Sequence, residues 1–236
     1  MASPRRPPRP RTPTALELRT RPRRWLLAVG ACILAMLLVR GFLVQSFSVA
    51  STSMQPTIEP GDRVLVSRLH RGPSVARGDL VVFDGASAFG NGGEPGASPG
   101  NQVLRSMASL FSLDTGTDYV KRVIGMPGDR VACCDASGRV TVNGIPLDEP
   151  YLYPGEVPST TRFDAVVPPG RIWVMGDHRS ESGDSRSRLG HPGGGMVALD
   201  DVIGTVWVRY WPIGRLGTLP RPTVLSLVPS PSGAGR

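Results

Sequence analysis

The 236-residue sequence contains only three cysteines and three histidines. The histidines are scattered and two of the cysteines are adjacent, so they do not form the spaced ligand sets typical of protein metal sites. We therefore expect neither a metal ion nor another cofactor. Aromatic residues make up only 6% of the chain, whereas it has 29 glycines and 24 prolines, a balance that favours strands and turns over helices.

The few cysteines leave one question open. Cys32 lies in an apolar segment, where a thiol packs as a small hydrophobic group. Cys133 and Cys134 are adjacent. The sequence alone is compatible with a disulfide between these neighbours and equally with two separately buried thiols.

Acidic residues are scarce at the N-terminus and the basic charge is concentrated there. Residues 1–24 hold eight arginines against one acid, Glu17, which accounts for seven of the eight net positive charges of the chain. The remainder is nearly neutral, which argues against nucleic acid as a partner, because a nucleic-acid-binding domain carries its basic patch on the fold. The Pro/Arg-rich tail lacks the apolar residues of a core, and we expect it to be disordered and cytoplasmic.

Residues 25–44 form the one long apolar run, WLLAVGACILAMLLVRGFLV. A helix of this length spans about 30 Å, the thickness of a bilayer core. Arg40 lies near its end, where a long side chain can extend to the interface. Because the arginines precede the run, the positive-inside rule places the N-terminus in the cytoplasm and the rest of the chain outside. We predict a single-pass protein of the plasma membrane.

A cleavable export signal is the alternative interpretation of this run. Ser48, Val49 and Ala50 have the small-x-small form of a cleavage site, and Arg23-Arg24 is compatible with a twin-arginine signal. The long basic region and the long apolar run favour a retained anchor instead.

Beyond the anchor, short apolar runs alternate with Gly-Asp and Pro-Gly-Asp turns. Asn143-Gly144 between two such runs predicts a hairpin. We therefore predict a mostly β, antiparallel extracytoplasmic domain over residues 45–213. Residues 85–117, a Gly/Ser/Asn-rich loop followed by a helical pattern, are interpreted as an insertion, and the Pro/Ser/Gly-rich residues 214–236 as a flexible tail.

Lysine occurs once, at Lys121, whereas the other 26 basic residues are arginines. Arg stays protonated in proteins, whereas a buried Lys can lose its proton and act as a base. A G+C-rich genome that prefers Arg codons is the alternative explanation of the imbalance. Upstream, directly after the anchor, Ser53 lies in the stretch SVASTSMQPTIEPGDRV. A neutral amine can activate a serine in place of histidine, so Ser53 and Lys121 are a candidate pair.

Four motifs occur in the order of one known family. These are SMQPT, RGDLVVF, YVKRVIGMPGDRV and GDHRSESGDSR, within residues 25–212. The chain resembles bacterial type I signal peptidases, membrane-anchored serine–lysine endopeptidases, with an actinobacterial-like preference for Arg. The resemblance implies the β catalytic fold of that family and a serine endopeptidase activity.

The resemblance also implies roles for individual residues. Ser53 is then the nucleophile and Lys121 the general base. Ser51 supplies an oxyanion-hole hydroxyl beside the Ser53 backbone N–H, and Ser182 orients the lysine amine. Three further residues are implied to support the site: Met54 beneath it, and the pair Asp184 and Arg186.

Two positions depart from the family pattern. Ala50 replaces a proline that often precedes the position of Ser51, and His178 stands where many members carry Asn. The match places His178 in a supporting loop rather than in the role of a catalytic base.

The function that this resemblance implies is removal of N-terminal signal peptides from exported preproteins after small-x-small sites. Expected partners are those signal peptides and the lipid bilayer, with the protein-export channel as a further candidate. One alternative is a self-cleaving serine–lysine protease of the repressor type, although such proteins lack an anchor. Another is a catalytically silent, membrane-anchored β module that binds partners, which would not need to retain both Ser53 and Lys121.

Overall fold

The computed structural model describes residues 25–34, 36, 43–69, 72–85, 89 and 118–229. The chain divides into two units, residues 1–41 and 42–236. Residues 25–34 and 36 are helical, but among the described residues no helix has the length and apolarity needed to cross a bilayer. The predicted tail over residues 1–24 and nearly all of the predicted insertion over 85–117 lie outside the described residues.

The larger sheet of the second unit has the strand order β1-β2-β11-β3-β4-β9-β10, with β12 beside β11. All of its recorded pairings are antiparallel. The strands are β1 (Val44–Ser48), β2 (Arg63–Ser67), β3 (Leu80–Asp84), β4 (Asp118–Gly125), β9 (Arg171–Met175), β10 (Val197–Ala198), β11 (Val202–Trp211) and β12 (Gly217–Thr218). The late strand β11 thus lies between the two early strands β2 and β3.

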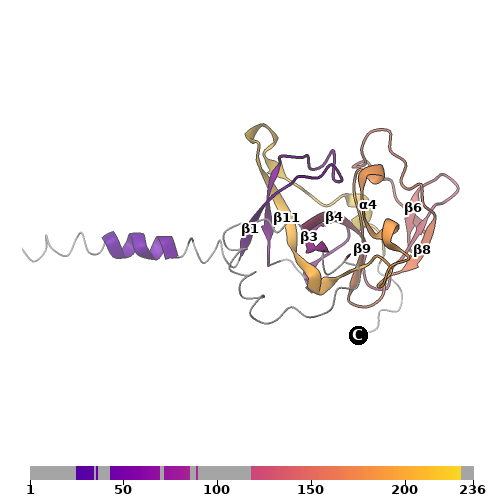
Figure 1. The fold of residues 1–236 in the computed structure, drawn as a ribbon, viewed down its shortest axis with the longest axis horizontal. Coiled ribbons are helices and arrows are strands. Elements are labelled where there is room, and N and C mark those ends of the chain that lie inside the picture. The colour runs from indigo at the N-terminus through magenta and orange to yellow at the C-terminus, as the bar shows by residue number, and fades with distance from the viewer. Residues whose placement is uncertain are drawn as a thin grey trace, which may run out of the picture. The chain divides into compact units, whose positions relative to one another are not determined.

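The smaller sheet has four antiparallel strands in the order β7-β6-β5-β8. They are β5 (Arg130–Cys133), β6 (Val140–Val142), β7 (Ile145–Pro146) and β8 (Phe163–Val166). Asn143 and Gly144 join β6 to β7 with φ angles of 53° and 80°, so the predicted hairpin is confirmed. In Figure 1, β1 and β11 lie at one end of this unit and β6 and β8 at the other.

The burial pattern of each strand follows from its sequence. Strand β8 alternates buried and exposed residues, whereas β3 is buried from Leu80 to Phe83 because both of its faces are covered: Leu80 and Val82 pack in one apolar core, and Val81 and Phe83 in another. The prediction of a mostly β, antiparallel domain is confirmed. Strand β1 begins at Val44, so the last residue of the predicted anchor belongs to the sheet instead.

In the described part of the second unit the helices are short, and all but the last lie in connections between strands. They are η1 (Gly72–Ser74), η2 (Arg179–Glu181), η3 (Ser185–Arg188), η4 (Leu199–Asp201), η5 (Ile213–Arg215) and α4 (Thr223–Ser226). The two that matter for the site are η2 and η3, because they follow β9 and carry the GDHRSESGDSR motif.

The C-terminal segment differs from the sequence prediction. Residues 214–236 were expected to form a flexible tail, but 217–228 contain β12 and α4, and Leu225 and Val228 are buried in the core that includes β5, β6 and β9 residues. The prediction was wrong here because the apolar stretch VLSLV, too short to span a membrane, is long enough to bury two side chains in a core.

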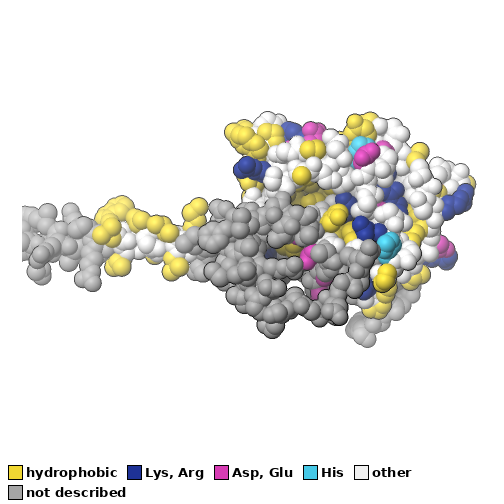
Figure 2. All heavy atoms as spheres, in the orientation of Figure 1, with side chains coloured by type: hydrophobic (Ala, Val, Ile, Leu, Met, Phe, Trp, Pro, Cys, Tyr) yellow, Lys and Arg dark blue, Asp and Glu magenta, His cyan; other side chains and the backbone are white. Residues whose placement is uncertain are grey.

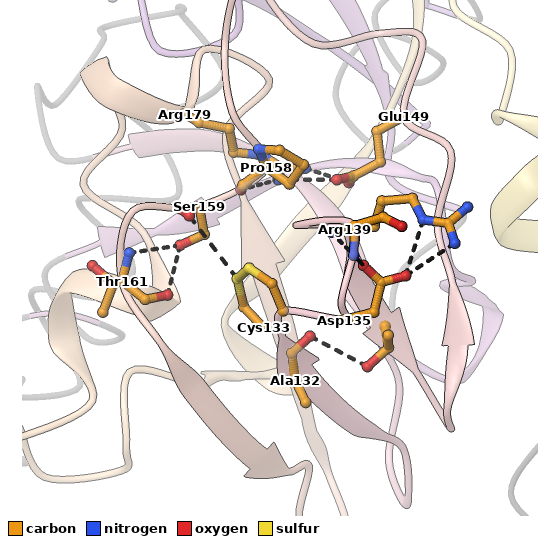
Figure 3. The surroundings of a disulfide bond; sticks show 12 residues. Ala132, Cys133, Asp135, Arg139, Glu149, Pro158, Ser159, Thr161 and Arg179 are labelled. Atoms are coloured by element: carbon orange, nitrogen blue, oxygen red, sulfur yellow. Dashed lines mark hydrogen bonds and ion pairs between the residues drawn. A yellow bond between two sulfur atoms is a disulfide. The ribbon is translucent and has the colours of Figure 1, made fainter.

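Cys133 and Cys134 form a disulfide at the end of β5, which answers the question that the sequence left open. Figure 3 shows Cys133 facing the backbone of Ser159. In the same region Arg179 of η2 pairs with Glu149 and donates to the carbonyl of Pro158. The smaller sheet is thereby joined to the loop that follows β9.

Candidate active site

Ser53 and Lys121 come together although 68 residues separate them in the sequence. Lys121 Nζ lies 2.6 Å from Ser53 Oγ and donates a hydrogen bond to it. Ser53 follows β1 in a turn, and Lys121 lies in β4 opposite Val81 of β3. Their residues are only 4% and 3% exposed, so the contact is shielded from bulk water.

Burial changes the acidity of the lysine. It lowers the pKa of Lys121 from 10.5 to about 8, opposed by the negative charges of Asp184 and Asp177 and assisted by the positive charge of Arg186. At pH 8 about half of these amines are therefore neutral, against about 0.3% for an ordinary lysine. Once the amine is neutral, its lone pair can accept the hydroxyl proton of Ser53 across the same short contact.

Ser51 lies beside the nucleophile position. The backbone N–H of Ser53 donates to Ser51 Oγ at 3.1 Å, and the Ser51 hydroxyl keeps its own hydrogen for another acceptor. The N–H and the hydroxyl are thus adjacent donors, an arrangement suited to an oxyanion once the hydroxyl turns away from the N–H.

The loop after β9 holds Ser53 from the other side. The backbone N–H of His178 donates to the carbonyl of Ser53 at 3.1 Å. Gly176 packs so closely that a Cβ there would lie 2.5 Å from the Ser53 carbonyl oxygen and 2.5 Å from Ser182 Cβ. Ser182 Oγ is buried and interacts with the Asp184 carboxylate, which helps to lower the pKa of Asp184, so among the described residues Ser182 lies at the site without the bond to Lys121 that the resemblance implies.

Asp184 and Arg186 form a bidentate ion pair. Arg186 Nε and Nη2 donate to Asp184 Oδ1 and Oδ2 at 2.9 and 2.8 Å. Asp184 also accepts the backbone N–H of Gly176 at 3.0 Å, while Arg186 donates to the carbonyl of Arg179 at 2.8 Å. The pair therefore fixes the backbone at both ends of the loop that contacts Ser53.

A cleft of about 320 Å³ opens beside the Ser53 hydroxyl. Its lining includes Met54, which is only 1% exposed, together with Phe47, Val49, Val82 and Val120. β1 ends the larger sheet, and β9 pairs with β4 only from Arg122 onward, so both cleft-lining strands have an edge free of described strand partners.

The sequence interpretation missed a buried network behind the pair. Arg122 donates to both carboxylate oxygens of Asp177 at 2.8 and 2.6 Å, and Thr57 Oγ1 donates to the same carboxylate at 2.5 Å. The network joins the Lys121 strand, the Ser53 turn and the loop after β9. Its signal was the position of these residues directly beside motif residues, in VKRV, SMQPT and GDHR.

His178 takes part in a supporting contact. Its ring stacks on Tyr153 with centroids 4.2 Å apart, and its Nε2 lies 3.5 Å from Glu156 Oε1. These contacts hold its ring against the loop that follows β7. Among the described residues, no cluster of His, Cys, Asp and Glu could hold a metal ion.

A serine hydroxyl in buried contact with a lysine amine, beside a cleft in an antiparallel β domain, is compatible with a serine hydrolase that uses lysine in place of histidine. Residues 22–211 match the family described as "Signal peptidase, peptidase S26". The chain belongs to this family of serine endopeptidases that remove signal peptides.

Curated relatives agree with the family match. A signal peptidase I of Mycobacterium tuberculosis (strain CDC 1551 / Oshkosh) is 36% identical over 219 residues, which cover 82% of this chain and 74% of the relative. A signal peptidase I of Bacillus caldolyticus is 34% identical over 206 residues, covering 81% of this chain and 92% of the relative. A solved signal peptidase I of Enterococcus faecalis V583 aligns with a TM-score of 0.35 at 24% identity, covering 56% of this chain and 95% of that one.

Proposed function

We propose that the protein is a membrane-bound signal peptidase in which Ser53 attacks the substrate and Lys121 is the general base. The observation that carries this proposal is the contact of 2.6 Å between Lys121 Nζ and Ser53 Oγ, together with the burial that lowers the lysine pKa to about 8. Burial of the charged form of Lys121 costs free energy, and a binding module without catalytic activity would gain nothing that offsets this cost.

The reaction follows from this geometry. Neutral Lys121 takes the hydroxyl proton of Ser53 while Oγ bonds to the carbonyl carbon of the scissile peptide, whose π electrons move to oxygen. The intermediate collapses, the C–N bond breaks, and Lys121 returns the proton to the leaving amine. A water molecule then gives a proton to Lys121 while its oxygen bonds to the acyl carbon. The bond between that carbon and Ser53 Oγ breaks, Lys121 returns the proton to Oγ, and the new carboxyl terminus leaves.

Two donors stabilise the developing oxyanion in this proposal. The Ser53 N–H and the Ser51 hydroxyl lie together, and binding of the substrate carbonyl replaces the bond between them. Loss of one such donor costs on the order of 3–4 kcal/mol in measured systems. Ser182 and the Asp184–Arg186 pair act on Lys121 through the loop after β9.

The cleft suits an extended peptide with small side chains near the cut. Strand edges of β1 and β4 can pair with substrate backbone, and the apolar lining around Met54 leaves limited room for side chains. Cleavage after small-x-small sites is the specificity that this supports. A self-cleaving repressor-type protease is the second candidate, and the apolar segment before β1 argues against it.

For the topology, we propose that the apolar segment after the arginine-rich tail is a retained anchor, with the N-terminus cytoplasmic and the β domain extracytoplasmic. The arginine asymmetry supports this orientation. β1 begins at Val44 and leads directly to Ser51 and Ser53, so little chain separates the segment from the site. The bilayer, signal peptides and the export channel are the proposed partners. N-terminal sequencing of cellular protein that began at Ser51 would contradict retention.

An exposed apolar tip supports contact with the bilayer. Trp211, Ile213 and Leu216, at the connection from β11 to β12, are 50%, 74% and 63% exposed, and Trp207 of β11 is 59% exposed. Figure 2 shows hydrophobic side chains at the corner of the unit where this connection lies in Figure 1. Trp and bulky apolar residues favour the membrane interface, so we propose that this tip enters it.

The tip proposal predicts a fluorescence result. The experiment uses full-length protein in vesicles whose acyl chains carry bromine, which quenches tryptophan fluorescence. Replacing Trp25 by Phe removes the fluorescence of the apolar segment, residues 25–44. The remaining fluorescence should be strongly quenched through Trp207 and Trp211. Trp173 is fully buried and serves as the internal control, because Trp207→Phe and Trp211→Phe together should leave an unquenched signal. Equal quenching before and after the double replacement would contradict the proposal.

The catalytic proposal predicts a pH dependence. Because the base must be neutral, cleavage of a precursor with an Ala-x-Ala site should rise with pH through a group that titrates at about 8. The measurement is kcat/KM for the purified protein, with the new N-terminus sequenced and a metal chelator present in a parallel series. Activity that rises only near 10.5, the pKa of an ordinary lysine, would contradict the role of Lys121.

A further inference from the structure

The turn that carries Ser53 is held by two arginines that lie outside the four sequence motifs. Arg209 Nη1 donates to the Thr57 carbonyl at 2.7 Å, and Arg215 Nη2 donates to the Pro56 carbonyl at 3.2 Å. Arg209 Nε also donates to the Arg215 carbonyl at 2.5 Å, so the first arginine orders the backbone of the second. Both belong to the β11–η5–β12 connection, far along the chain from Ser53.

Charge pairing fixes Arg215 to the same turn. Its Nη1 lies 2.7 Å from Glu59 Oε2 and 3.4 Å from Asp62 Oδ2. Asp62 is 1% exposed and accepts the Glu59 backbone N–H at 2.8 Å, so its carboxylate is part of the turn rather than a surface group. One guanidinium therefore contacts a carbonyl and two carboxylates of the segment that follows Ser53.

These contacts complement those already described. The loop after β9 holds the Ser53 carbonyl through His178, and Asp177 holds the Thr57 side chain. Neither contact fixes the backbone carbonyls of Pro56 and Thr57. Without the two arginines, the turn would keep its internal bonds, the Thr57 side-chain bond and the burial of Met54 and Ile58 in the apolar core, but it would lose the described contacts to the carbonyls of Pro56 and Thr57.

We propose that Arg215, oriented by Arg209, is a positioning residue for Ser53: it holds the nucleophile turn at the distance from which the hydroxyl meets the lysine amine. The proposal rests on the proposed role of Ser53. Arg215 acts through the turn and contacts neither Ser53 nor Lys121. Its loss should therefore weaken the chemical step and leave substrate binding in the cleft largely intact, because a displacement of a reacting group by about 1 Å costs roughly a hundredfold in rate.

The test compares full-length Arg215→Ala with wild type in vesicles. We expect kcat to fall about 10- to 100-fold while KM stays within about twofold. Arg215→Lys should restore part of kcat, since it keeps the attraction to Glu59 but lacks the planar set of donors. The pH midpoint should stay at about 8, because the burial of Lys121 is unchanged. Arg130→Ala is the matched control: it removes an exposed arginine paired with Asp164 on the smaller sheet and should leave kcat unchanged.

Amide hydrogen exchange gives a readout independent of catalysis. The Gln55 and Ile58 amides should exchange faster in Arg215→Ala, with amides of β5 and β8 unchanged. Unchanged kcat and exchange would overturn the proposal. Faster exchange throughout the domain would also overturn it, because it would show a general structural role. If the wild-type protein cleaved no precursor, the proposed function would be wrong. Faster exchange confined to the Gln55 and Ile58 amides would in that case still show that Arg215 holds the turn that carries Ser53.

Discussion

Lys121→Arg is expected to abolish cleavage as completely as Lys121→Ala, with a loss of at least about 10³-fold in kcat/KM. If Lys121 served only as a positive charge, Arg would be an adequate replacement, as it supplies every other basic position in the chain. If the side chain must be neutral to take the Ser53 proton, Arg fails because a guanidinium stays protonated in proteins. The assay is cleavage of an Ala-x-Ala precursor by the purified variants.

Lys121→Met provides the matched control for folding. Met is close to Lys in length, needs no partner in an apolar site and should give an inactive protein with intact near-ultraviolet circular dichroism. Arg is larger, and Lys121 is only 3% exposed, so the Arg variant needs the same spectral check. Substantial turnover by a folded Arg variant with Ser53 intact would show that Lys121 is a structural cation.

Gly176→Ala is expected to lower kcat about 100-fold, although it adds a single methyl group. The new Cβ would lie 2.5 Å from the Ser53 carbonyl oxygen, which is closer than van der Waals contact allows, so the nucleophile turn or the loop after β9 must shift. Either shift disturbs the contact of 2.6 Å between Ser53 and Lys121. The measurement is single-turnover cleavage, which isolates the chemical step from product release.

Gly190→Ala controls for the general effect of removing a glycine near this loop. No atom lies within 4 Å of the Cβ position at Gly190, and its backbone does not adopt the left-handed conformation. This variant should retain activity close to wild type. Equal activities of the Gly176 and Gly190 variants would mean that close packing against Ser53 does not set its position.

The sequence predicted the parts of the molecule that local patterns encode. Turns such as Asn143-Gly144 and the runs between them predicted antiparallel strands, because a two-residue turn specifies which strands pair. It also selected Ser53 and Lys121 as candidates, because a lone lysine among arginines marks a chemical requirement. The Arg122–Asp177–Thr57 network and the arginine contacts with the Ser53 turn were not predictable in this way, since they depend on strand neighbours that lie far apart in sequence.

The C-terminal segment shows that composition can also predict too little structure. Its Pro, Ser and Gly content is typical of a flexible tail, yet Leu225 is fully buried. Composition averages over a window, whereas burial depends on whether the fold offers one apolar site to one side chain.

The placement of β11 has a consequence for folding during synthesis on the ribosome. β2 and β3 are early strands, but they are not neighbours: β11, residues 202–211, lies between them and pairs with both. The half of the sheet next to Ser53 and the half that carries Lys121 therefore cannot join until almost the whole chain has been synthesised. In a nascent chain without β11, Ser53 lies next to the β1–β2 pair and Lys121 lies in the β3–β4 pair, and no described strand joins the two pairs. We therefore expect the serine–lysine contact, and the hydrolytic activity that depends on it, to form only after β11 has been synthesised.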